Sequence, residues 1–198
     1  MRLPRLLEAV ARLGMHKRAV AMVFSSRDAS IVPVMAVVAA VCHIAVGPII
    51  SRSFHMPGPT IAGPVIMAPI MVAGAVTQRR GTLLLTSAVN GLILSFFVPI
   101  GVLAFPVYVF VGLVLELFYA KSSRRLFKPL YSFLAGGVSN AASILLIAMF
   151  GLGMRATIPL TIISAVGFVT GGIGGLIASG VMLRIKHMYP SGSLSNPQ

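Results

Sequence analysis

Acidic residues are scarce in this sequence: Glu8, Asp28 and Glu116 are its three carboxylates, against 16 Lys and Arg. Cysteine is rarer still, and the single Cys42 excludes both an intrachain disulfide and a cysteine-based metal site. Charged residues make up 10% of the chain, whereas a soluble domain has about 25%. Hydrophobic residues reach 57%, with a mean hydropathy of +0.98. This balance predicts a polytopic, all-α membrane protein in one 198-residue chain.

The motifs of the common enzyme classes are also missing. The sequence has no GxSxG, no HExxH, no Walker loop and no pair of carboxylates suited to hydrolysis. Its four histidines, at positions 16, 43, 55 and 187, fall at different predicted depths, so we expect neither a metal nor another cofactor. The net charge of +13 does not indicate nucleic acid, because the basic residues lie in short loops between apolar runs. We therefore expect a protein that is not an enzyme.

Six apolar runs predict six membrane spans, each close to the roughly 17–25 residues that a spanning helix needs, except the fourth. They are Ile31–Ser51, Thr60–Thr77, Thr82–Pro99, Val107–Ala120, Pro129–Phe150 and Thr157–Leu183. Apolar residues before them recur at three- and four-residue steps, which predicts an amphipathic helix at the membrane surface. The predicted organisation is a cytoplasmic amphipathic segment (1–28), a six-helix membrane domain (29–184) and a cytoplasmic tail (185–198).

The basic residues predict the orientation. With both termini on the cytoplasmic side, the outer loops keep only Arg52 and Arg155 of the 16 Lys and Arg. This distribution obeys the positive-inside rule and supports the count of six spans. We expect a multi-pass protein of the cell membrane with both termini in the cytoplasm.

Glu116 is the one acid that must lie at membrane depth, where an ionisable group costs roughly 2.5–3.5 kcal/mol on insertion scales. It is therefore a candidate substrate-binding residue. The alternative is a carboxylate near the cytoplasmic helix end that pairs with Lys121 or Arg124. The choice depends on depth: Glu116 lies near the midplane if its helix begins after Pro106, and nearer the cytoplasm if the helix begins at Gly101.

Other polar side chains are candidates for the same site. Asn90 and Asn140 are costly to bury, so each should find a partner or a ligand. Asn140 and Ser143 are three residues apart and share one helical face. A satisfied interhelical hydrogen bond is the simpler role for each Asn alone, but together with Tyr108 and Glu116 the set can line a small polar pocket. One carboxylate with several amides suits a neutral-to-cationic aminopyrimidine better than an anion.

Small residues and one outer loop complete the candidates. A ladder at positions 167, 171, 175 and 179 predicts close helix packing within the chain. Ala36 and Ala40 form a similar step in the first span, which can serve internal packing or another membrane subunit. The outer loop 51–59 contains His55 beside a Pro-Gly-Pro turn, which fits either a short connection or a lid over an outward-facing pocket.

These features resemble the substrate-binding S components of energy-coupling factor (ECF) transporters. The Arg80-Gly81 step, and the Gly112 to Glu116-Leu117 step followed by a basic run, look like the YkoE-type group linked to thiamine and its hydroxymethylpyrimidine precursor. The resemblance covers about a quarter of the chain by sequence and the rest by architecture. Asn90 departs from it, because such families often place an acidic residue in that region.

The resemblance implies a binding subunit that captures a vitamin-like molecule from outside. It would associate in the lipid bilayer with a membrane coupling (T) subunit and two ATPase subunits, docking through Ala36 and Ala40. Glu116, Asn90, Tyr108, Asn140, Ser143 and His55 would contact the substrate. The alternative is a non-transport assembly or structural subunit of a membrane complex, in which Glu116 is merely salt-bridged.

Overall fold

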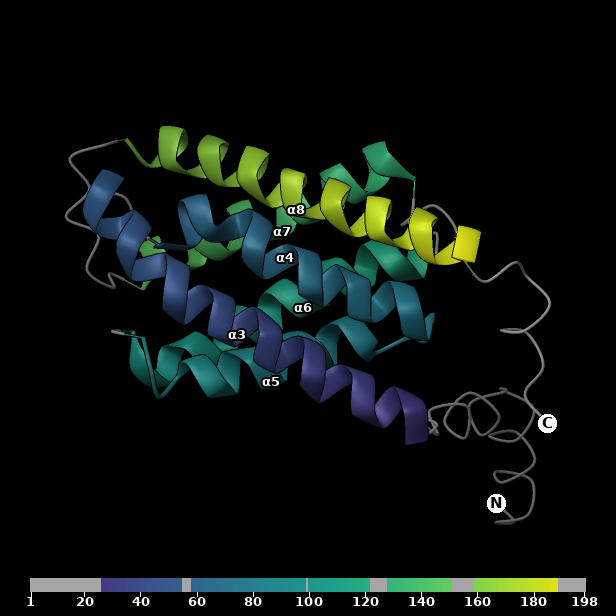
Figure 1. Cartoon of the computed structure of the whole chain (residues 1–198). Helices are drawn as coiled ribbons and strands as arrows, with labels where there is room; N and C mark the ends of the chain where they lie inside the picture. The colour runs from purple at the N-terminus through teal and green to yellow at the C-terminus, as the bar shows by residue number, and fades with distance from the viewer. Residues whose placement is uncertain (1–25, 55–57, 99, 122–127, 151–158, 189–198) are drawn as a thin grey trace, which may run out of the picture. The chain divides into compact units, whose positions relative to one another are not determined.

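The computed structural model describes residues 26–54, 58–98, 100–121, 128–150 and 159–188 (Figure 1). The chain divides into two compact units, residues 1–30 and 31–198, and the described helices belong almost entirely to the second. The elements are α3 (Ser26–Phe54), α4 (Gly58–Thr77), α5 (Thr82–Leu94), the 3-10 turn η1 (Gly101–Leu103), α6 (Ala104–Lys121), α7 (Pro129–Met149) and α8 (Leu160–Met188). The described residues contain helices and no strand, which confirms the all-α prediction.

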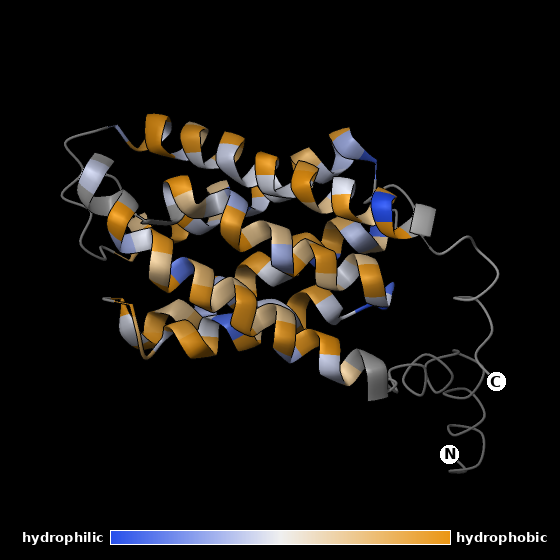
Figure 2. Ribbon diagram, in the orientation of Figure 1, coloured by the Kyte–Doolittle hydropathy of each residue, from blue (hydrophilic) through white to orange (hydrophobic). Residues whose placement is uncertain are grey.

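Five of these helices are long and apolar enough to cross a membrane, which identifies a multi-pass membrane protein by length and composition. Their apolar stretches are Ala29–Ile49, Thr60–Thr77, Gly101–Lys121, Pro129–Met149 and Leu160–Ile185. In Figure 2 the hydrophobic residues, coloured orange, are spread along all of the helices. Many of them are exposed, such as Val34 and Val41 of α3 at 56% and 57%. Apolar exposure on this scale is expected of a surface that faces lipid.

The predicted third span is shorter than expected, so the structure does not establish the count of six. Helix α5 has 13 residues and ends at Leu94, and residues 95–98 continue as turns. The residue before a proline disfavours the helical conformation, and Pro99 follows Val98 in the sequence. The hydroxyl of Ser95 also donates to the carbonyl of Gly91 at 2.8 Å, which closes the last turn.

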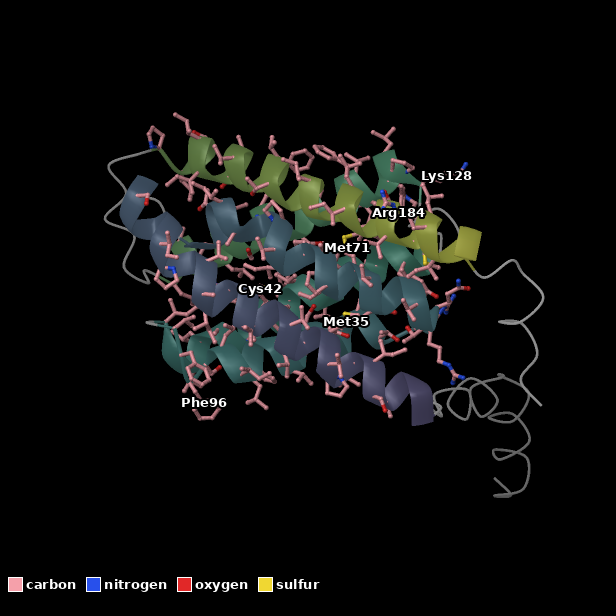
Figure 3. All side chains as sticks on the ribbon, viewed as in Figure 1. Met35, Cys42, Met71, Phe96, Lys128 and Arg184 are labelled. Carbon is pink, nitrogen blue, oxygen red and sulfur yellow. The ribbon has the colours of Figure 1, made fainter. Side chains whose placement is uncertain are left out.

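The helix that carries Glu116 begins between the two predicted starts. Residues 101–103 form one 3-10 turn and α6 starts at Ala104. Glu116 is then five residues, or about 8 Å along the axis, from the helix end at Lys121. Lys128 and Arg184 lie at the same end of the bundle (Figure 3). With the 3-10 turn included, the start of this helix is closer to the earlier of the two predicted starts, Gly101.

The helices pack in two groups. Helix α8 lies against both α4 and α7, and α5 lies against α6 (Figure 1). Glycines make the first group possible: a Cβ on Gly136 would collide with the carbonyl of Gly171, and one on Gly175 with the carbonyl of Ser132. The prediction that the ladder in the last span serves close packing within the chain is therefore confirmed.

Several predictions fall outside the described residues. Most of the amphipathic segment (residues 1–25) does, as do His55 and residues 189–198. Two predicted boundaries differ from the helix ends, since α3 already begins at Ser26 and α8 continues to Met188. Long apolar helices extend a turn beyond their apolar core because nothing in the flanking sequence, neither a proline nor a glycine, stops them there.

Candidate functional site

One face of α6 packs against α5, and the two helices run antiparallel. Tyr108, Gly112 and Glu116 are four residues apart and so share a helical face. A Cβ on Gly91 would lie 2.7 Å from the Cβ of Tyr108, and a Cβ on Gly112 would lie 2.9 Å from the Cβ of Ser87. The absence of these two Cβ atoms lets the helices approach, and it places Tyr108 at one end of the contact and Glu116 at the other.

Glu116 caps the N-terminus of α5. Its Oε1 accepts a 2.6 Å hydrogen bond from the backbone N–H of Gly81, the residue that precedes the helix. Gly81 has φ +85°, a left-handed conformation that favours glycine, and this turns its N–H toward α6. A carboxylate is well placed there because the first N–H groups of a helix have no partners within the helix and carry partial positive charge. The Arg80-Gly81 and Gly112-to-Glu116 motifs are thus two halves of one helix contact.

Tyr108 joins α6 to the first span. Its hydroxyl lies 2.9 Å from Nδ1 of His43 on α3, and the two rings meet edge to face with centroids 6.2 Å apart. Both side chains are buried, at 4% and 7% exposed. The pair brings a phenol and an imidazole together inside the bundle.

Helix α5 carries two further polar side chains near its contact with α6. Ser87 and Asn90 are both 0% exposed and three residues apart, so they share a face of the helix. Within the described part of the chain, the hydroxyl of Ser87 and both amide atoms of Asn90 have no hydrogen-bond partner. Asn90 directly precedes Gly91, against which Tyr108 packs.

Asn140 belongs to a different place, between α4, α7 and α8. Its Nδ2 donates to the carbonyl of Gly167 at 2.8 Å and lies 3.4 Å from the hydroxyl of Thr170. That hydroxyl in turn donates to the carbonyl of Thr60 at 2.5 Å. The single-residue interpretation, an interhelical hydrogen bond, therefore describes what Asn140 does in the structure. Ser143 donates to the carbonyl of Asn140 at 2.7 Å, a bond within α7.

The structure thus separates the residues that the sequence grouped into one pocket. Asn90 is next to Gly91, against which Tyr108 packs, and Glu116 lies about 12 Å from Tyr108 along α6. Asn140 and Ser143 lie on α7, in the other helix group. Glu116 bonds to the backbone of Gly81 rather than to Lys121, and Arg124 falls outside the described residues. Ala36 and Ala40 are each 0% exposed, so in this conformation both methyl groups contact the chain's own helices.

Sequence reasoning did not select two residues beside this site, His43 of α3 and Ser87 of α5. Each carries a weak signal. Ser87 precedes Asn90 by three residues, the same spacing that linked Asn140 to Ser143. His43 is the one histidine that lies inside a predicted apolar run, which indicates a buried polar partner.

Comparison with solved structures identifies the class of fold. The chain matches a crystal structure described as an S component of an ECF transporter, with a TM-score of 0.67 and 20% sequence identity. The match covers 86% of this chain and 88% of that one. No family model and no curated protein matches the sequence. The fold is therefore that of an S component, and it extends over nearly the whole chain.

Proposed function

We propose that the protein is the substrate-binding S component of an ECF-type importer. The observation that carries this proposal is the S-component fold over 86% of the chain. A second observation supports it: the buried carboxamide of Asn90 has no partner within the described residues. A buried amide without a hydrogen bond costs free energy, so a bound solute would supply what the chain does not.

The substrate we propose is a vitamin or vitamin precursor, of the thiamine or hydroxymethylpyrimidine kind. The support is the sequence resemblance to the YkoE-type group, together with the amide and hydroxyl groups near Tyr108. The motifs that carry the resemblance support a shared α5–α6 contact more than a particular ligand, because Gly112 and Glu116 have packing and capping roles in that contact. His55 remains a proposed part of the substrate site.

The partners follow from the proposed class. A membrane coupling (T) subunit and two ATPases would complete the importer, because the sequence has no Walker loop with which to hydrolyse ATP. The exposed face of α3 consists of valines such as Val34, Val37 and Val41, whereas Ala36 and Ala40 are buried. Docking through the alanine step would therefore require α3 to move away from the rest of the bundle.

One set of contacts favours the second candidate, a structural or assembly subunit of a membrane complex. Oε1 of Glu116 and the side chains of Asn140 and Ser143 bond to backbone groups of this chain, as expected for residues that stabilise the fold. This candidate predicts that no small solute binds.

A thermal-shift panel separates the two candidates. We would heat the full chain in detergent with thiamine, hydroxymethylpyrimidine, riboflavin, biotin, pyridoxine or folate. A solute that binds only the folded state adds roughly 2.7 kcal/mol of stability at a hundredfold excess over Kd. We expect one solute of the thiamine group to raise the unfolding temperature in a saturable way. No response to any of the six would favour the structural subunit.

A further inference from the structure

Three buried polar atoms of α5 have nothing to bond to within the described residues: Oγ of Ser87 and both Oδ1 and Nδ2 of Asn90. All three atoms are buried, so solvent at the protein surface does not reach them. The contrast with Asn140 is informative, because that residue has a backbone carbonyl at 2.8 Å. An amide left entirely without a partner in the same bundle indicates a place where something else binds.

The surroundings of Asn90 define what that place offers. Ser87 lies on the same face of α5, and Tyr108 packs against the adjacent Gly91. The hydroxyl of Tyr108 connects the cluster to His43 on α3. A carboxamide, two hydroxyls and an imidazole from three helices therefore lie around the contact between Gly91 and Tyr108.

Carboxylates are absent from this cluster. Of the three acids in the sequence, Glu116 is the only one beyond residue 28. Glu116 is about 12 Å from Tyr108 along the axis of α6, and its Oε1 is bonded to the backbone N–H of Gly81. A cationic solute bound beside Asn90 would find no counter-charge there, and burying an unpaired charge is far costlier than burying a neutral polar group.

We propose that Asn90, with Ser87, His43 and Tyr108, binds an uncharged planar solute that presents a hydrogen-bond donor next to an acceptor. The amide of Asn90 has the same two functions side by side, so it pairs with such an edge through two hydrogen bonds. Amides and aminopyrimidines have this edge. The inference rests on the proposed function and narrows it, since it favours the neutral hydroxymethylpyrimidine over thiamine, whose thiazolium ring is a permanent cation.

The test compares two asparagines by the same substitution in the full-length protein. Asn90→Leu keeps the approximate side-chain volume and removes the unpartnered amide, whereas Asn140→Leu removes an amide that bonds to Gly167. We would measure the unfolding temperature without ligand and the affinity for hydroxymethylpyrimidine and thiamine by calorimetry.

We expect the wild-type protein to bind hydroxymethylpyrimidine at least tenfold more tightly than thiamine. Asn90→Leu should unfold at the wild-type temperature or above it and lose at least tenfold in affinity. Asn140→Leu should unfold at a lower temperature and keep its affinity. A merely structural Asn90 would show the opposite pattern, with lower stability in Asn90→Leu.

The failures of this inference and of the proposed function look different. If the wild-type protein binds a solute and Asn90→Leu binds it equally well, the site is wrong and the proposed function stands. If thiamine binds as tightly as hydroxymethylpyrimidine or more tightly, the requirement for an uncharged solute is wrong. If the wild-type protein binds neither these two nor any other solute of the vitamin panel, both the proposed function and this inference are overturned.

Discussion

Glu116 holds the first turn of α5 through one backbone N–H, and we predict that its removal is measurable as lost stability. Glu116→Ala leaves the Gly81 N–H without its acceptor and should cost about 0.5–2 kcal/mol, as loss of a helix cap does. Glu116→Gln keeps an acceptor but loses the charge near the helix N-terminus, worth about 0.3–1 kcal/mol. Unfolding of both variants in detergent, with and without ligand, checks this.

Lys121→Gln is the matched control, because Lys121 is exposed on the same helix and should leave stability unchanged. Ligand affinity should survive in folded Glu116→Gln, since the carboxylate lies about 12 Å from Tyr108 along α6. Loss of binding at wild-type stability would instead place Glu116 in the substrate site.

The sequence could predict that Glu116 matters but not what it does. An isolated acid in an apolar helix needs a partner, and charged side chains nearby are the partners that a sequence displays. The actual partner is the main chain of Gly81, 35 residues away, and a backbone N–H leaves no signature in composition. The role of Asn140 was easier to predict, because an interhelical hydrogen bond is the ordinary role of a buried amide and Asn140 makes one to Gly167.

At the scale of helices, the contact between α7 and α8 should be sensitive to a single methyl group. We predict that Gly171→Ala destabilises the protein. The new Cβ would clash with the Cβ of Asn140 and would lie 2.5 Å from the carbonyl oxygen of Gly136. Overpacking of this kind costs about 1–3 kcal/mol. Thermal unfolding in detergent and resistance to a protease measure the loss.

Gly180→Ala is the matched control on the same helix, since no atom lies within 4 Å of the position of its Cβ. It should be neutral or stabilising, as alanine is the better helix former by about 1 kcal/mol. Equal effects of both substitutions would show that α8 does not pack through its glycine face.

The sequence predicts helices of this kind better than it predicts where they end. Small residues four apart indicated the packing face of α8, because close approach of two backbones requires them in that register. The apolar run predicts that α5 ends at Pro99, whereas the helix ends five residues earlier, at Leu94. Apart from Ser95, the residues from Leu94 to Val98 are all apolar, so hydropathy does not mark the end of the helix. The helix ends there because of the Ser95 hydroxyl and the restriction on the residue before Pro99.

At the scale of the whole molecule, the orientation in the membrane is a prediction that α7 can test. Its ends are Lys128, which precedes it, and Phe150, which follows it, and both are exposed. Cys42 is the only cysteine, so a Cys42→Ala background allows one new thiol at a time. We expect a membrane-impermeant maleimide to label Phe150→Cys in intact cells, and Lys128→Cys only after permeabilisation. The reverse pattern would contradict cytoplasmic termini.

The short α5 raises the question of where residues 95–103 lie, because its 13 residues span only about 20 Å of a hydrocarbon layer of about 30 Å. The turns there satisfy their own backbone, with the N–H groups of Phe96, Phe97 and Val98 bonded to Ile93 and Leu94. Phe96 and Val102 are each 80% exposed, and Figure 3 shows Phe96 pointing away from the helices. Bonded backbone and exposed apolar side chains both suit lipid rather than water.

We therefore predict that the connection between α5 and α6 is immersed in the bilayer. The sequence has no tryptophan, so Phe96→Trp supplies a single fluorophore. In vesicles its emission should be blue-shifted and quenched by lipids brominated on their acyl chains. Lys128→Trp, at the basic end, should be quenched by aqueous acrylamide instead. If acrylamide reaches both sites equally, the connection is an aqueous loop, and α5 with its following turns does not complete a sixth crossing.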